Sequence, residues 1–251
     1  MDQRSIEQAA SLLAQARRTG SRLGGLPPAC RPVTIVDALA IQAATVSLLG
    51  EAVGAWKVGA PVDGRLVHGA IPRSRVFASP ARVRAADMPM LGIEAEIAFR
   101  FDQGLPAGAR EYTYEDVAEA VTALVAIEIV DSRYTNYAGA PVLDKIADCV
   151  SNGGFVRGTV HADWRRFDLT SLTASLAIDG KTVVRQVGGH AARDPLLPAV
   201  AFANDRRTEG GLPPGAIVTT GTFTGLRFAK PGQAVVAAFE GFGSAEVTFD
   251  A

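Results

Sequence analysis

LGIEAEIAFRF, residues 91–101, is the stretch that most constrains the fold of this chain. Apolar and polar residues alternate in it with a period of two, which predicts a β-strand with one face toward a core. Because the Cβ direction repeats every second residue, Glu94 and Glu96 share the face opposite the apolar side chains. The pair indicates either a half-solvated strand with a charged outer face or two carboxylates within reach of one ion.

A third acidic residue, Glu128, lies in the segment LVAIEIV, residues 124–130, with apolar neighbours on both sides. An unpaired carboxylate in a buried strand is costly, so this residue must be paired with a base, neutralised or bound to a metal. Pairing with Arg133 or another base is the structural alternative. If the three carboxylates meet, they form an oxygen-only set, which suits Mg²⁺, Mn²⁺ or Ca²⁺ rather than Zn²⁺.

Around this acidic core the sequence alternates between helical and extended patterns. Helical spacing and capping residues predict helices at residues 4–18, 34–50, 113–124 and 195–207. Strand patterns follow at residues 55–61, 91–101, 125–131, 171–187 (a hairpin that turns at Asp179-Gly180), 216–225, 233–240 and 243–250. These patterns predict an α+β fold. We expect an N-terminal helical segment, residues 1–70, to pack on a catalytic β-rich domain, residues 71–251, in one structural unit.

The composition excludes several classes of protein. The 251 residues are 48% hydrophobic, and a formal net charge of −1 gives no basic excess for nucleic acid. No apolar run reaches the roughly 18 residues that span a bilayer. Only Cys30 and Cys149 occur, which excludes a disulfide framework, and the charged N-terminus does not resemble a signal peptide. We therefore expect a cytoplasmic protein that binds neither nucleic acid nor membrane.

Further candidate site residues occur in three short motifs. Lys57, in AWKVG, is either a surface lysine or a semi-buried amine that offsets negative charge and exchanges protons. Asp148 and Ser151, in ADCVSNGG, are either turn residues or donors and acceptors for a carboxylate ligand. In TTGTFTG, residues 219–225, Thr222 is either a plain strand residue or a substrate contact, and Gly221 allows a ligand to approach the backbone.

The order of these motifs resembles a known family. The series K-V-G, E-A-E-I-A-F, I-E-I-V-D-S-R, A-D-x-x-S-x-G and T-T-G-T is similar to the fumarylacetoacetate hydrolase superfamily, in its branch of 2-keto-4-pentenoate hydratases and 4-oxalocrotonate decarboxylases. The resemblance extends from about residue 5 to residue 249. It implies a mixed β-roll or barrel-like core of the fumarylacetoacetate hydrolase C-terminal type with an N-terminal helical segment, assembled as a homo-oligomer.

The resemblance also implies roles for individual residues. It assigns Mg²⁺ or Mn²⁺ to Glu94, Glu96 and Glu128, acid/base chemistry to Lys57, and a substrate-facing position to Ser151. The expected activity is that of a lyase that hydrates a 2-keto-4-pentenoate-type acid through an enolate. The alternatives are decarboxylation of 4-oxalocrotonate or another 2-oxo diacid, hydrolysis of an acylpyruvate, and an inactive accessory subunit. A paired decarboxylase or hydratase subunit is a possible partner.

The sequence departs from the family pattern around the expected pocket. Ala60-Pro61 replaces a frequent T-S pair, A-D-C-V-S replaces A-D-N-A-S, and Phe202 stands where a tryptophan is common. The Glu–His pair that the hydrolases carry on a lid has no match, which argues against C–C hydrolysis. A decarboxylase for a diacid needs an additional cation, for which the candidates are Arg73, Arg75 and Arg133.

Overall fold

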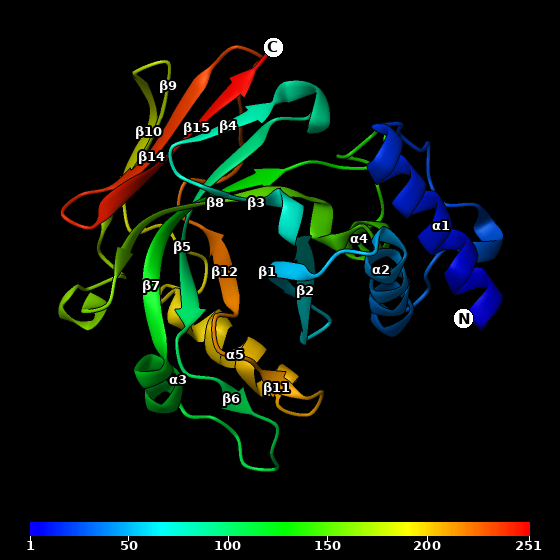
Figure 1. Ribbon diagram of the computed structural model, residues 1–251, viewed down its shortest axis with the longest axis horizontal. Coiled ribbons are helices and arrows are strands. Elements are labelled where there is room, and N and C mark those ends of the chain that lie inside the picture. Colours follow the sequence, from blue (N-terminus) through cyan, green and yellow to red (C-terminus); the bar gives the residue numbers. More distant parts are fainter.

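Two β-sheets pack against each other in the computed structural model, which describes residues 1–251. The larger sheet is strongly curved, and the smaller one covers its convex side (Figure 1). In spatial order, the larger sheet contains β2 (Arg65–Pro72), β1 (Val53–Val62), β12 (Ile217–Thr222), β5 (Gly92–Phe101), β7 (Val121–Val130), β8 (Asn152–His161) and β3 (Val76–Ala78), with β13 (Arg227–Phe228) paired to β5. The smaller sheet contains β10 (Lys181–Val187), β9 (Thr173–Ile178), β14 (Ala234–Phe239), β15 (Gly243–Asp250) and β4 (Ala81–Arg84).

Five α-helices and a short ribbon complete the fold. The helices are α1 (Gln3–Thr19), α2 (Ile35–Leu49), α3 (Tyr114–Ala120), α4 (Val142–Ala147) and α5 (Leu196–Arg206). The ribbon pairs β6 (Leu105–Pro106) with β11 (Gly211–Leu212). Single 3₁₀ turns occur at Pro28–Cys30, Arg73–Arg75, Ala85–Asp87, Cys149–Ser151 and Trp164–Arg166. None of these helices has the length and apolar character needed to cross a membrane.

The period-two pattern of β5 separates the core from the acidic face. The odd-numbered residues of β5 and β7 lie in the main hydrophobic core, against side chains of the smaller sheet such as Phe239 and Val247. The even-numbered residues face the concave side of the larger sheet. One part of that side is closed by a small apolar cluster that includes Ala98, Leu124 and Phe155. The other part holds the acidic residues.

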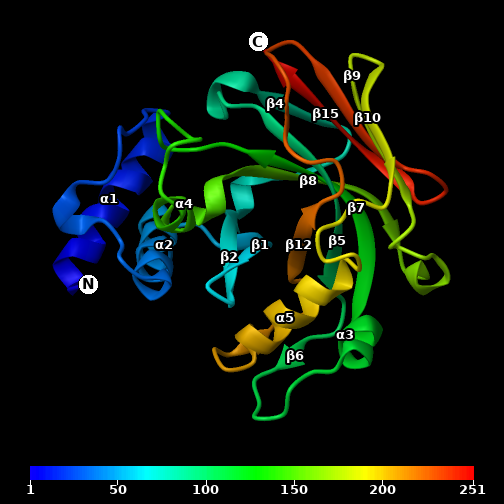
Figure 2. The same cartoon turned by 180° about the vertical axis from the view of Figure 1, so that it is seen from behind.

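The two N-terminal helices pack beside α4, away from the smaller sheet, as both views show (Figures 1 and 2). Each ends at a glycine in the left-handed region, Gly20 or Gly50, and α2 begins with the predicted Thr34–Asp37 capping box. Their buried side chains form a second core that also includes Val67 and Tyr134 from the rest of the chain. We propose a single structural unit on this ground. The division expected between residues 70 and 71 falls inside β2, and the helical part ends at Leu49.

Two sequence predictions of secondary structure were wrong in extent. The helix expected at residues 113–124 ends at Ala120, and residues 121–124 belong to β7. Their pairing with β5, from Phe101↔Val121 onward, outweighs the helical spacing of this segment. No strand is predicted for residues 62–90 or 132–170, yet they contain the strands β2, β3, β4 and β8. Tertiary pairing, rather than local periodicity, makes these segments extended.

Candidate active site

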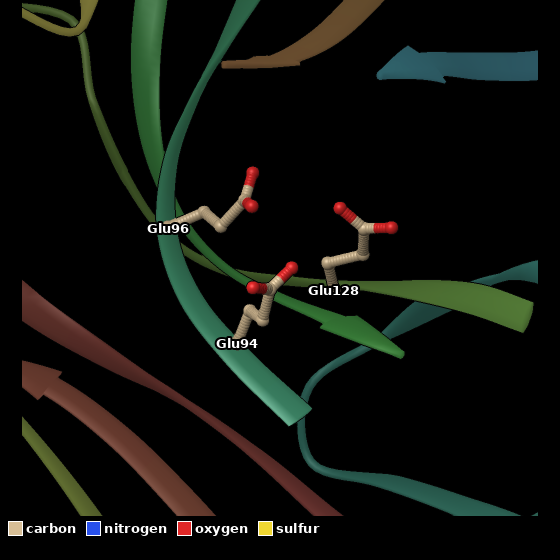
Figure 3. A group of neighbouring side chains, drawn as sticks. All are labelled: Glu94, Glu96 and Glu128. Carbon is tan, nitrogen blue, oxygen red and sulfur yellow. The ribbon is translucent and has the colours of Figure 1, made fainter. Parts of the chain in front are cut away.

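Three glutamates converge on the concave face of the larger sheet. Glu94 and Glu96 project from β5, and the antiparallel register places Glu94 directly opposite Glu128 of β7. One carboxylate oxygen from each residue lies within 4.8 Å of one from each of the others, and Figure 3 shows the side chains pointing into a common space. Glu96 and Glu128 are each 1% exposed, and Glu94 is half-buried. The predicted convergence of the triad in space is therefore present.

The electrostatics of the site favour the neutral forms of Glu94 and Glu96 when no cation is bound. Burial, followed by repulsion from Glu128, raises the pKa of Glu94 to about 7. The same two causes, together with Glu94, raise the pKa of the Glu96 carboxyl well above its usual range. A carboxylate set that is buried and mutually repulsive needs positive charge, and one lysine is present to supply it.

That lysine is Lys57 on β1, which is buried and forms an ion pair with Oε1 of Glu128 through its Nζ atom. Burial alone would lower the pKa of Lys57, but the charges of Glu128 and then Glu94 raise it above the ordinary value. Gly69 lies opposite on β2, where an added Cβ would be 2.4 Å from the Cys149 carbonyl oxygen and 3.0 Å from Cγ of Lys57. Glycine is required there for close packing around the lysine.

The base that pairs with Glu128 is Lys57, and not Arg133. The Arg133 guanidinium donates to both Asp131 and Asp148 and to backbone carbonyl oxygens. The carboxylate of Asp148 accepts from Nε of Arg133 at 2.7 Å and from Nη2 of Arg17 at 3.1 Å. Asp148, a predicted substrate contact, therefore forms part of a buried ion-pair network.

Two hydrogen-bond donors from β12 hold the Glu96 carboxyl group in place. The hydroxyl of Thr219 and the backbone N–H of Gly221 both donate to Oε2 of Glu96, the latter at 3.1 Å. No protein donor bonds Oε1, which leaves that oxygen for the space shared with Glu94 and Glu128. The motif T-T-G-T was noted in the sequence, but the role of Thr219 was missed because it depends on the pairing of β12 with β5.

Ser151 and Thr222, the other two predicted substrate contacts, differ in their surroundings. Ser151 ends a turn in which Cys149, Val150 and Ser151 all have positive φ, near 53°, and its buried hydroxyl has no hydrogen-bond partner. Backbone strain and an orphaned hydroxyl are features of functional sites. The turn contacts β2 at Gly69, the residue opposite Lys57. Thr222 is half-buried, pairs with Glu96 across the sheet, and accepts a hydrogen bond from the backbone N–H of Thr224.

One residue near the triad has no sequence signal. Tyr137 lies in the loop between β7 and α4, half-buried, with Nζ of Lys145 4.6 Å from its ring centroid. Burial raises the pKa of its phenol, and Lys57, Glu94 and Glu128 lie close enough for their charges to affect that pKa. Loop residues of this kind come to a site only through tertiary structure.

Comparison with known proteins agrees with this geometry. Residues 67–250 match the family model described as fumarylacetoacetate (FAA) hydrolase C-terminal. The 2-keto-4-pentenoate hydratase of Burkholderia vietnamiensis is 31% identical, over 99% of this chain and 98% of its own length. The 4-oxalocrotonate decarboxylase of Pseudomonas putida is 27% identical, over 53% of this chain and 51% of its own.

A solved structure shows the same fold. The 4-oxalocrotonate decarboxylase from Pseudomonas putida G7, complexed with magnesium and adipate, superimposes with a TM-score of 0.84 at 19% identity and covers 99% of this chain and 98% of its own. The predicted α+β architecture, with a curved mixed sheet and N-terminal helices, is confirmed. By its match to the family model and its full-length relatives, the chain belongs to the fumarylacetoacetate hydrolase family.

Proposed function

We propose that this protein is a divalent-cation-dependent lyase that hydrates a small 2-hydroxy-2,4-dienoic acid of the 2-keto-4-pentenoate type. The observation that carries the proposal is the convergence of three carboxylates beside a buried lysine. The relatives that match over nearly the whole chain and are named 2-keto-4-pentenoate hydratase support the choice of reaction.

The residues of the triad fit a hard divalent cation. All three donors are carboxylate oxygens, which Mg²⁺ and Mn²⁺ prefer. Three ionised carboxylates and the Lys57 ammonium leave two net negative charges, which one divalent cation would balance. We propose that Glu94, Glu96 and Glu128 hold Mg²⁺ or Mn²⁺. When bound, such a cation polarises the 2-oxygen of the substrate and stabilises the negative charge that develops on it.

The chain's own residues would then move protons and orient the acid. In the hydration, the 2-hydroxyl group loses a proton and C5 gains one, which gives a 2-oxo-3-enoate. Water then adds its oxygen to C4 while C3 is protonated. Lys57 is a titratable side chain beside the triad that is not one of the proposed ligands, so we assign proton transfer to its Nζ atom. We propose that Ser151 and Thr222 contact the substrate, since the Ser151 hydroxyl has no partner in the protein.

Decarboxylation of a 2-oxo diacid is less well supported. It requires a cation free to bind the distal carboxylate. Arg133, one of three arginines considered for that role, uses its donors on Asp131, Asp148 and carbonyl oxygens. Arg75 already has an acidic neighbour, since its Nη1 atom lies 4.0 Å from Oδ2 of Asp87. In sequence, the decarboxylase relatives match over only part of the chain, although a decarboxylase shares the fold over its whole length.

The test is an activity screen with Mg²⁺ or Mn²⁺. It offers 2-hydroxypenta-2,4-dienoate, 4-oxalocrotonate, oxaloacetate and acylpyruvates, follows the loss of ultraviolet absorbance, and identifies products by mass. We expect the dienoate to be consumed with a mass gain of one water. Release of CO₂ from 4-oxalocrotonate without hydration would establish the decarboxylase instead, and no turnover of any substrate would overturn the proposal.

We also propose that the protein works in the cytoplasm as a homo-oligomer and pairs with a decarboxylase or hydratase subunit. Exposed apolar side chains at Val33, Val36 and Phe228 support association, since they lie 57–76% exposed. Sizing chromatography coupled to light scattering measures the mass, and a monomer at micromolar concentration would contradict the oligomer.

Cation binding should depend on pH. Burial and repulsion raise the pKa of Glu94 to about 7 and also raise the pKa of Glu96, so cation binding must displace protons below about pH 7. We expect Mn²⁺ affinity, measured by calorimetry, to fall about tenfold or more from pH 8 to pH 6.

The same raised pKa values affect stability with the opposite sign. A raised carboxyl pKa stabilises the fold at low pH, and that contribution is lost as the pH rises through about 7. Mn²⁺ should therefore raise the melting temperature more at pH 8 than at pH 6. Equal affinities and equal thermal shifts at the two pH values would contradict this account.

A further inference from the structure

His190 lies behind the segment that fixes Glu96. It belongs to the connection between β10 and α5 and is 7% exposed. Its Nδ1 atom accepts the backbone N–H of Ala192 at 3.2 Å, so the ring proton lies on Nε2, which donates to the carbonyl oxygen of Thr220 at 2.9 Å. Burial lowers the pKa of this imidazole, which favours the neutral form that makes both bonds. The histidine is therefore locked onto the backbone of the T-T-G-T motif.

The backbone that His190 holds is irregular. The pairing of β12 with β5 shifts register between Thr219 and Thr222, and Gly221 has a φ of +118°, a conformation that L-residues rarely adopt. A Cβ at Gly221 would also lie 3.2 Å from Nε2 of His190. Conformation and the adjacent ring thus both require glycine.

This irregularity is what directs the Gly221 N–H to the acidic site. In the bulge, that N–H donates to Oε2 of Glu96 at 3.1 Å, next to the bond from the Thr219 hydroxyl. His190 donates to the carbonyl oxygen of Thr220, which belongs to the same peptide unit as the N–H of Gly221. A peptide plane held at its oxygen has its N–H direction fixed as well.

We infer that His190 is a positioning residue that orients the Thr220–Gly221 peptide so that Glu96 is held by Oε2 and presents Oε1 to the cation. The inference rests on the proposed cation-binding role of the triad. It adds a residue that touches neither substrate nor cation and acts through a single peptide unit. Partners of this kind, one step behind a ligand, typically change metal affinity by about 10- to 100-fold.

The test compares three substitutions at position 190 by Mn²⁺ calorimetry and by the electron paramagnetic resonance of bound Mn²⁺. His190→Gln places an amide N–H near the position of Nε2 and should keep the affinity within about threefold of the parent. His190→Asn can keep the acceptor for the Ala192 N–H but loses the donor to the Thr220 carbonyl oxygen. His190→Leu loses both hydrogen bonds. Both should weaken Mn²⁺ binding at least about tenfold. The Asn and Gln pair decides the question if the Leu variant fails to fold.

His161 provides the matched control. Its Nε2 atom contacts the carbonyl oxygen of Phe242, so His161→Leu removes the same kind of bond at a place with no link to Glu96. That variant should bind Mn²⁺ like the parent. Parental affinity in His190→Asn, or an affinity in His190→Gln as low as in His190→Asn, would overturn the inference while leaving the proposed function intact. A parent that binds no Mn²⁺, or a Glu96→Gln variant that binds it as tightly as the parent, would instead overturn the proposed function, and the inference with it.

Discussion

Replacing Glu96 by glutamine is expected to reduce cation-dependent turnover on the order of 1,000-fold while leaving the fold intact. The substitution removes one of three carboxylates from a site where Glu96 is 1% exposed. Thr219 and Gly221 both donate to Oε2, so the amide oxygen of glutamine would take those bonds. The amide NH₂ would then point toward Glu94 and Glu128, where a donor opposes a cation.

The fold should survive because glutamine is a neutral side chain of the same shape as a buried carboxyl group whose ionised form is disfavoured. Without added cation, the melting temperature should equal or exceed that of the parent, because the burial and repulsion that raise the pKa of Glu96 destabilise its ionised form, and glutamine cannot ionise. Glu246, an exposed glutamate on β15, gives the control substitution Glu246→Gln. Parental turnover and parental Mn²⁺ affinity in Glu96→Gln would remove the cation hypothesis.

Lys57→Met should lower turnover by about 10²- to 10⁴-fold, the usual range for an acid/base group. Methionine has a similar length and can occupy the same buried space. The affinity for Mn²⁺ should be retained or increased, because Nζ no longer bonds Oε1 of Glu128. Steady-state kinetics with saturating Mn²⁺ separates the two effects from each other.

The cation-free form of this variant should also lose stability. Removal of the ammonium leaves the buried Glu128 carboxylate without its ion pair, and Mn²⁺ should restore the melting temperature. Lys181→Met, at the exposed start of β10, is the matched control and should behave like the parent. Unchanged turnover in Lys57→Met would retire its acid/base role, and an equal loss of turnover and affinity would make it a residue that only orders the site.

Much of the local structure follows from short-range chemistry. The capping boxes at Thr34–Asp37 and Thr113–Asp116 start helices where predicted, because side-chain and backbone groups three residues apart satisfy each other. The turn Asp179-Gly180 closes the predicted hairpin, since both residues adopt positive φ. These features depend on neighbours within a few residues.

The end of the helix after Thr113 is not set by neighbours close in sequence. Residues 121–124 have a helical spacing, yet they extend β7 because they pair with β5 and bury their side chains. The ion pairs of Asp148 with Arg17 and Arg133 likewise depend on long-range packing. Arg17 lies 131 residues away in sequence, and no local pattern connects the two.

Alternation and burial are local properties of a chain, so they predict without a structure that Glu94 and Glu96 share one face of a strand and that Glu128 is a buried acid needing a partner. That these residues meet depends on long-range packing. The antiparallel register sets Glu94 opposite Glu128, and β12 lies between β5 and β1, which brings Lys57 and Thr219 to the same space. Register and strand order are fixed by the packing of the whole sheet, in which a shift of one residue would turn the acids into the core.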